Sequence, residues 1–131
     1  MNRIANLTYC QIVSDGWRVT VTFPDGRTCP AVPHMTPHYH VISHRCGYGD
    51  DVAAYCFEHE VAHAVVCEVL WDQPSPVLDA VASGRMLSGR DAVAEELLAQ
   101  TLQRFARAGE RPIIGGIDWD AMRARFLEAV A

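Results

Sequence analysis

A five-residue motif near the middle of the chain places the strictest requirement on its structure. The motif is His59-Glu60-Val61-Ala62-His63 and has the spacing HExxH. On a helix, residues four apart lie one turn apart on one face, so both imidazoles can contact the same metal ion. The glutamate between them then lies close to a water molecule at that metal. Two core histidines satisfied by hydrogen bonds, without a metal, are the alternative interpretation.

The motif lies within a longer segment that has helical periodicity. Apolar or core-type residues recur at three-and-four spacing from Val52 to Leu70, and both histidines of the motif fall on this stripe. Asp50 or Asp51 can cap the start of the helix, which should end before Pro74. The pattern therefore predicts a helix whose histidine-bearing face is turned toward the core.

The chain before this helix is predicted to be mainly β structure. Turn signals separate short runs of alternating apolar residues, which is typical of an antiparallel meander. The runs span Leu7–Val13, Trp17–Phe23 and Arg27–Val32, with a possible fourth strand at Tyr39–Ser43. The sequence thus predicts a small N-terminal antiparallel sheet of three or four strands.

Further helices are predicted after the motif. A short one ends near Ser83-Gly84, a second spans Asp91–Ala108, and a third runs from Asp118 as its cap to Val130. The prediction is an α+β fold, with three or four helices after the sheet. We expect a single domain over residues 1–131, with 1–50 mainly β and 51–131 mainly helical.

A catalytic metal site needs a third protein ligand and an open position for water. The extended pattern HExxHxxGxxH is excluded, because Val66 and Val69 stand where its glycine and last histidine belong. The predicted second helix offers Glu95 and Glu96 instead. Asp79 is a weaker alternative.

The sequence resembles the gluzincins, which are zinc metallopeptidases with a glutamate ligand on a helix after the HExxH helix. The resemblance covers roughly residues 51–105. In the thermolysin-like enzymes and the repressor-cleaving metallopeptidases of mobile elements, a small residue tends to follow the ligand at i+3 and a polar one at i+4. A helical wheel favours Glu95, which lies nearer the apolar stripe of its helix. Glu96, however, has Ala99 and Gln100 at those positions, whereas Glu95 has Leu98 and Ala99. Glu96 is therefore the preferred ligand and Glu95 the alternative.

The resemblance implies a zincin-like domain in which His59, His63 and Glu96 bind zinc. Glu60 would be the general base that deprotonates the bound water, and the product would be a cleaved peptide bond. Gln100 would hold the first histidine in its ligating tautomer. An edge strand of the preceding sheet would bind an extended peptide. A binding or regulatory module, with structural zinc or none, is the alternative from a different class.

A second stretch rich in possible ligands precedes the motif. It contains His34, His38, His40, His44 and Cys46. Its spacing matches no zinc-finger pattern, so we interpret it as a polar loop near the site. From there a histidine, Tyr39 or Tyr48 can reach the carbonyl of a substrate. A closed structural zinc that uses Cys46 or Cys56 with His59 is a further alternative.

Composition indicates which partners to expect. The 11 Lys and Arg against 16 Asp and Glu give a formal net charge of -5, which disfavours nucleic acid. No apolar run approaches the roughly 20 residues that span a bilayer, and the first residues lack a secretory signal pattern. Five cysteines without a CxxC pair favour reduced thiols. We therefore predict a cytoplasmic protein with a peptide or protein substrate and no nucleic-acid or membrane partner.

Overall fold

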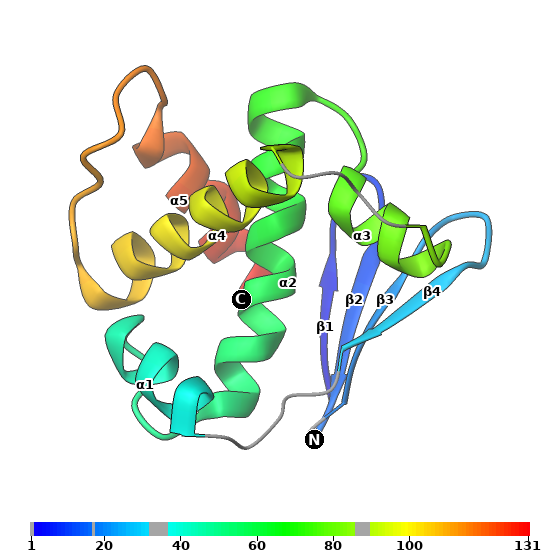
Figure 1. Ribbon diagram of the computed structural model, residues 1–131, viewed down its shortest axis with the longest axis horizontal. Coiled ribbons are helices and arrows are strands. Elements are labelled where there is room, and N and C mark those ends of the chain that lie inside the picture. The colour runs from blue at the N-terminus through cyan, green and yellow to red at the C-terminus, as the bar shows by residue number, and fades with distance from the viewer. Residues whose placement is uncertain (1, 17, 32–36, 86–89) are drawn as a thin grey trace.

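A four-stranded antiparallel sheet and a set of helices form two sides of the molecule, with the helix that carries the HExxH motif between them (Figure 1). The computed structural model describes residues 2–16, 18–31, 37–85 and 90–131 of the chain. The strands are β1 (Asn2–Asn6), β2 (Gln11–Asp15), β3 (Arg18–Thr22) and β4 (Thr28–Ala31), adjacent in that order. The helices are α1 (Pro37–Arg45), α2 (Val52–Val66), the π-helix η1 (Cys67–Trp71), α3 (Pro76–Ala82), α4 (Arg90–Ala108) and α5 (Trp119–Val130).

One face of the sheet is apolar and packs against α2. Pairing places Ala5 opposite Ile12, Ile12 opposite Val21, and Val21 opposite Cys29, so these four side chains form a row across all four strands. All four are buried. Residues of β2 and β3 contact α2, and this one-sided burial explains the alternation in the sequence that identified β3.

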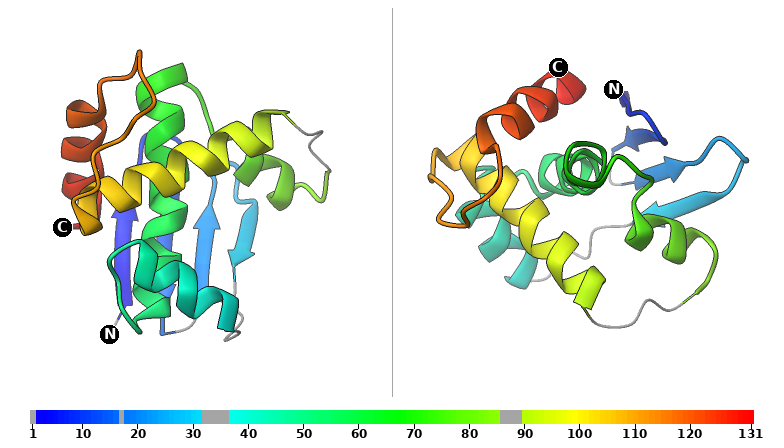
Figure 2. Two further views of the ribbon diagram at one scale, coloured as in Figure 1. Left: turned by 60° about the vertical axis from the view of Figure 1, so that its left-hand side comes forward. Right: turned by 90° about the horizontal axis from the view of Figure 1, so that it is seen from above.

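Helix α2 has the start that the sequence predicts. The Asp51 carboxylate caps it by accepting a hydrogen bond from the backbone N–H of Ala54, at 3.1 Å. The helix continues into η1 and ends at Asp72, which has a left-handed conformation with φ of 48° and precedes Pro74. Figure 2 shows α4 crossing α2 on the side away from the sheet. His59 and His63 of the HExxH motif therefore contact α4.

The other predicted helices are also present. Ser75 and Asp118 cap α3 and α5 through side-chain oxygens that accept backbone N–H groups. Helix α4 ends one residue before Gly109, as its C-terminal signal predicts. None of the described helices combines the length and the apolar character needed to cross a membrane.

Two local predictions about the N-terminal third are wrong. Tyr39–Ser43 lies in α1 and is helical, because the side chains turned inward, at 39, 42, 43 and 46, follow helical spacing. The segment Leu7–Val13 is interrupted: the chain turns at Leu7–Cys10, where the Leu7 N–H donates to the Cys10 carbonyl, so the strand begins only at Gln11. The preceding strand β1 was not expected from the sequence.

The α+β order is confirmed, although the described chain contains five α-helices, more than the three or four expected. Three residues named in the predictions lie outside the described residues. They are Trp17 and Val32, at the ends of predicted strands, and His34 of the histidine-rich stretch.

Candidate metal centre

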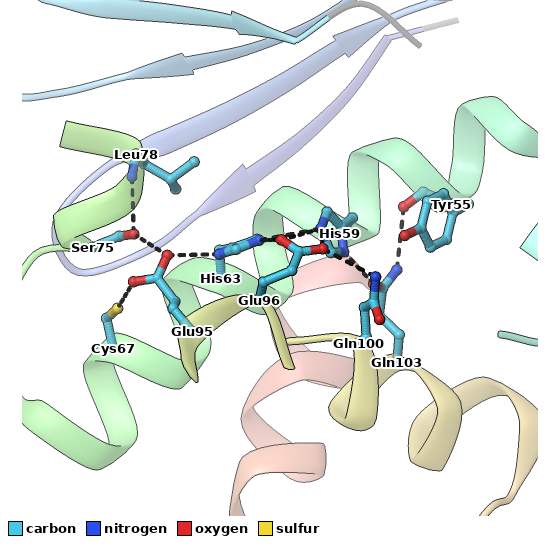
Figure 3. A network of polar contacts seen from close by, with 10 residues as sticks. All are labelled: Tyr55, His59, His63, Cys67, Ser75, Leu78, Glu95, Glu96, Gln100 and Gln103. Atoms are coloured by element: carbon cyan, nitrogen blue, oxygen red, sulfur yellow. Dashed lines mark hydrogen bonds and ion pairs between the residues drawn. The ribbon is translucent and has the colours of Figure 1, made fainter. Parts of the chain in front are cut away.

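Two histidines of α2 and one glutamate of α4 converge on a single point (Figure 3). The Nε2 atoms of His59 and His63 are 3.2 Å apart. The Glu96 carboxylate lies 2.8 Å from Nε2 of His63 and 2.9 Å from Nε2 of His59. Ala99 is fully buried in the same helix as Glu96, and its small side chain permits the close approach of α4 to α2. Within the described ranges, His59, His63 and Glu96 are the group that could hold a metal ion.

Glu95 has a different position, behind His63. Its side chain is fully buried and accepts a hydrogen bond from Nδ1 of His63 at 2.6 Å. It also accepts from the Ser75 hydroxyl and from the Cys67 thiol, each at 2.8 Å. Glu95 thus lies toward the core, as its place near the apolar stripe of α4 predicts. Its carboxylate nevertheless lies outside the group of possible ligands and orients the imidazole of His63 instead.

Gln103 orients the other histidine. Its amide nitrogen donates to the backbone carbonyl of Tyr55 and to the Tyr48 hydroxyl, both at 3.2 Å. Because a carbonyl can only accept, this fixes the amide, and the amide oxygen faces Nδ1 of His59 at 2.6 Å. Gln100, which was expected in this role, instead donates to the Glu96 carboxylate at 3.1 Å. The prediction for Gln100 is therefore corrected: it supports the glutamate rather than the histidine.

The hydrogen bonds from Gln103 and Glu95 determine which nitrogen of each histidine faces Glu96. Both histidines donate their Nδ1 protons outward, so a neutral imidazole at each position presents the Nε2 lone pair to the Glu96 carboxylate. Three acceptors that converge in this way require a positive charge between them. In a tetrahedral site with bonds of about 2.0–2.1 Å, ligand atoms lie about 3.3 Å apart. The separations of 2.8 to 3.2 Å are close to this value, so the residues fit a divalent metal ion.

The ionisation of the cluster is consistent with this requirement. Burial disfavours a charged His63, but hydrogen bonds to Glu95 and Glu96 outweigh this and raise the pKa of His63 to about 10. Burial also disfavours an ionised Glu96, yet its contacts with both histidines hold the pKa of Glu96 well below its usual range. A proton on His63 supplies the positive charge when no metal is bound, and a metal would release that proton.

Glu60 lies beside the cluster in an open cleft of about 560 Å³. It lines the cleft together with His59, His63 and Glu96, and no hydrogen bond joins its carboxylate to another residue of the described segments. Burial, together with the nearby charge of Glu60, raises the pKa of Cys29 and of Cys56 to about 11. These thiols therefore stay neutral near pH 7, and the Glu60 side chain borders the cleft beside the three possible ligands.

The cleft lies between two walls. The first is formed by His38, Tyr39 and Ile42 of α1 with Tyr55 and Cys56 of α2. The second is formed by Val77, Leu78 and Val81 of α3 with Cys29 and Pro30 of β4. Tyr55 also stacks on the His59 ring, with centroids 5.4 Å apart. The metal cluster and Glu60 lie between the walls.

The remaining sequence candidates have other positions. His38 and Tyr39 line the cleft, but the Tyr48 hydroxyl donates to Glu58 at 2.6 Å. His44 contacts Asp50 at 2.7 Å. Asp79 pairs with Arg27, which lies just before β4, and with Arg85, which lies just after α3. None of the described cysteines joins His59 in a group that could hold a metal. The alternative ligand sets with Cys46, Cys56 or Asp79 are therefore wrong for the described part of the chain.

Three residues that hydrogen-bond to His59 or Glu95 from outside the ligand cluster were not predicted from the sequence: Gln103, Ser75 and Cys67. Gln103 lies seven residues after Glu96, two helical turns further along the same face, so periodicity could have indicated it. Ser75 and Cys67 approach Glu95 only because α3 and η1 fold back toward α4, and no local signal in the sequence indicates this contact.

We expect Gln103→Leu to lower the affinity for a divalent metal ten- to a hundredfold, about the loss that follows removal of an outer partner of a ligating histidine. The leucine removes the acceptor for the His59 Nδ1 proton and leaves the Tyr55 carbonyl without its donor. Gln100→Leu is the matched control and should cost less, because Glu96 keeps its own charge. Competition titration with a zinc-binding dye measures both. An equal loss for the two variants would contradict the assigned role of Gln103.

Comparison with known proteins gave no match to a family model, to a curated protein or to a solved structure.

Proposed function

We propose that the chain is a zinc-dependent hydrolase that cleaves peptide bonds in the manner of the gluzincins. The observation that carries this proposal is the position of Glu60: an unengaged carboxylate in an open cleft, next to three converging acceptors. Two imidazoles and one carboxylate are the ligand set of many catalytic zinc sites. A general base next to such a set is what hydrolysis requires.

The residues of the chain have separate roles in this proposal. When bound, zinc acts as a Lewis acid that polarises the substrate carbonyl and lowers the pKa of water. Glu60 accepts a proton from the attacking water as the new C–O bond forms. It then returns the proton to the amine nitrogen as the C–N bond breaks. Glu95 and Gln103 keep the two imidazoles in the ligating tautomer throughout.

The shape of the cleft supports a peptide as the substrate. β4 is an edge strand of the sheet, and its residues Cys29 and Pro30 line the cleft. An extended peptide can pair with an edge strand through main-chain hydrogen bonds and so pass the metal centre. His38 and Tyr39, on the opposite wall, carry groups of the kind that donate a hydrogen bond to a substrate carbonyl.

The open side of the site favours hydrolysis over a purely structural metal. Structural zinc sites are closed by four protein ligands. The described residues bring three ligands together, and these border a cleft with room for substrate. A binding module with structural zinc is therefore the less supported alternative.

Removal and restoration of zinc tests the proposal. Protein loaded with one equivalent of zinc is incubated with a peptide library, then with dipicolinate, then with added zinc. We expect cleavage that stops on chelation and returns with zinc, with only a small change in melting temperature. Stoichiometric zinc without any cleavage, combined with unfolding on chelation, would instead identify a structural metal and overturn the proposal.

A further inference from the structure

Helix α4 has a second hollow on its surface besides the cleft at the metal centre. Leu97, Thr101 and Arg104 line this hollow from α4. Residues 110–114, in the connection from α4 to α5, line it from the other side (orange in Figure 1). Its volume is about 340 Å³. No described residue lines both this hollow and the cleft, so the hollow is a surface that the proposed hydrolysis does not use.

Aliphatic side chains at this hollow are exposed to an extent that the packing of a single copy does not explain. Ile113 is 99% exposed, so it projects from the surface, and Leu97 is 53% exposed in the hollow beside it. Val93, one helical turn before Leu97, is 66% exposed and extends the apolar strip along α4. Exposed apolar patches with a polar rim mark interaction sites on soluble proteins.

The loop that carries Ile113 is held in place on both sides of this residue. The Glu110 N–H donates to the Arg104 carbonyl at 3.2 Å, and the Glu110 carboxylate accepts from the Arg104 guanidinium at 2.9 Å. After Ile113, the Ile114 carbonyl accepts the indole N–H of Trp119 at 2.9 Å, and the Ile114 side chain packs against the core. A loop fixed in this way loses little conformational entropy when a partner buries its exposed side chain.

The charged side chains around the hollow balance each other. Arg104 pairs with Glu110 at 2.9 Å, and Arg111 pairs with Asp120 at 3.1 Å. The chain as a whole carries a formal net charge of -5, so two copies repel each other on average. At this hollow the rim has no net charge and offers groups of both signs. A second copy presents the same two signs, so each Arg111 can lie opposite an acidic group of the other copy.

The shape of this surface is complementary to itself. A two-fold contact between identical chains needs a projection and a recess on the same patch, and Ile113 projects beside an apolar recess. We propose that the occupant of the hollow is a second copy of this chain, in a two-fold dimer in which Ile113 of each copy inserts beside Leu97 of the other. This dimer goes beyond the proposed function and depends neither on zinc nor on hydrolysis.

The small size of the patch sets the expected strength of the dimer. Its exposed aliphatic side chains are Val93, Leu97 and Ile113, whereas a stable interface of standard size uses about 20–30 residues a side. We therefore expect a weak dimer, with a dissociation constant of about 10–100 µM. Ile113→Asp should raise this constant at least tenfold, because the dimer would bury a carboxylate in the apolar hollow of the other copy.

Sedimentation equilibrium of the full chain, from about 1 µM to about 1 mM, measures this association. The matched control is Val41→Asp: Val41 is a 57% exposed aliphatic residue of α1 that does not line the hollow. We expect the control to dimerise like the parent protein and Ile113→Asp to stay monomeric over most of the range. Because Ile113 is almost fully exposed in one copy, its replacement should leave the circular dichroism spectrum and the zinc content unchanged.

A mixture of two variants tests which side chains meet. Leu97→Arg places a charge in the hollow and should also stay monomeric by itself. Mixed with Ile113→Asp, it should form a heterodimer. In one contact, the native Ile113 of the first variant enters the native hollow of the second. In the other contact, the new carboxylate meets the new guanidinium.

Three results would overturn the inference. The first is a parent protein that stays monomeric up to the highest concentration. The second is an Ile113→Asp variant that dimerises as tightly as Val41→Asp, which would place any dimer contact elsewhere. The third is a mixture of Ile113→Asp and Leu97→Arg that associates no better than either variant alone. None of these results bears on peptide cleavage, so the proposed function stands or falls separately.

Discussion

Glu60→Gln should lower kcat/KM for peptide cleavage by about a thousandfold while leaving the bound zinc in place. A positioned general base contributes about a hundred- to ten-thousandfold to such reactions, and an amide cannot accept the proton. The carboxylate makes no hydrogen bond to the described residues and is not in the cluster of possible ligands, so the substitution removes proton transfer without disturbing the site. Steady-state kinetics and zinc content per chain measure the two effects.

The control for this substitution is Glu128→Gln. Glu128 is an exposed residue of α5 whose contact with Arg125, at 3.4 Å, is weak. This variant carries the same change of charge and should keep parental activity. If Glu60→Gln cleaves peptides as fast as Glu128→Gln, Glu60 is not the base and the proposed mechanism is wrong.

Substitution of the two adjacent glutamates should lower zinc affinity to different degrees. Glu96→Gln should lower zinc affinity by more than about a hundredfold, which exceeds the loss expected for an outer partner, because it replaces a charged ligand by a neutral amide. Glu95→Gln should lower affinity only about ten- to a hundredfold. It should also lower the free energy of unfolding by about 1–3 kcal/mol, since a buried carboxylate with three hydrogen-bond donors becomes an amide.

The two variants are matched in chemistry and differ only by one position on α4. Chelator competition gives the zinc affinities, and urea denaturation of the metal-free proteins gives the stabilities. A larger loss of zinc affinity in Glu95→Gln than in Glu96→Gln would exchange the roles of the two glutamates and contradict the assigned ligand set.

The parts of the fold that the sequence predicts well are those specified locally. Helices α2, α4 and α5 each combine an apolar stripe with a cap or a terminal glycine, and these signals act within a few residues. Helix α1 was not predicted, because Val41 and Ile42 favour a strand and only contacts with α2 show which side chains turn inward. The turn at Leu7–Cys10 lacks glycine and proline, so nothing local marks it.

The candidate site also has a part that local sequence predicts and a part that only packing decides. His59, Glu60 and His63 follow from the motif, because four-residue spacing on a helix sets their geometry. The choice between Gln100 and Gln103 could not be made from the sequence alone, since both follow Glu96 on the same side of α4. Which one reaches His59 depends on the angle at which α4 crosses α2, and that angle is set by packing around Ala99.

Gly47 illustrates a requirement that appears only in the folded chain. It has φ of 90°, and a Cβ atom there would lie 2.6 Å from the carbonyl oxygen of Arg107, so only glycine fits. The close approach brings the end of α4 to Tyr48 and Glu58, where the Tyr48 hydroxyl and the Arg107 guanidinium both donate to the Glu58 carboxylate. This network supports Gln103, and through it His59, from the side away from the cleft.

Anomalous diffraction from crystals of the zinc-loaded protein, collected on both sides of the zinc absorption edge, tests the central claim most directly. We predict one peak per chain, bonded to Nε2 of His59, Nε2 of His63 and the carboxylate of Glu96, with Glu95 behind His63 and the fourth position open to the cleft. A peak enclosed by four protein ligands, a peak bonded to Glu95, or no peak at this cluster after loading would contradict it.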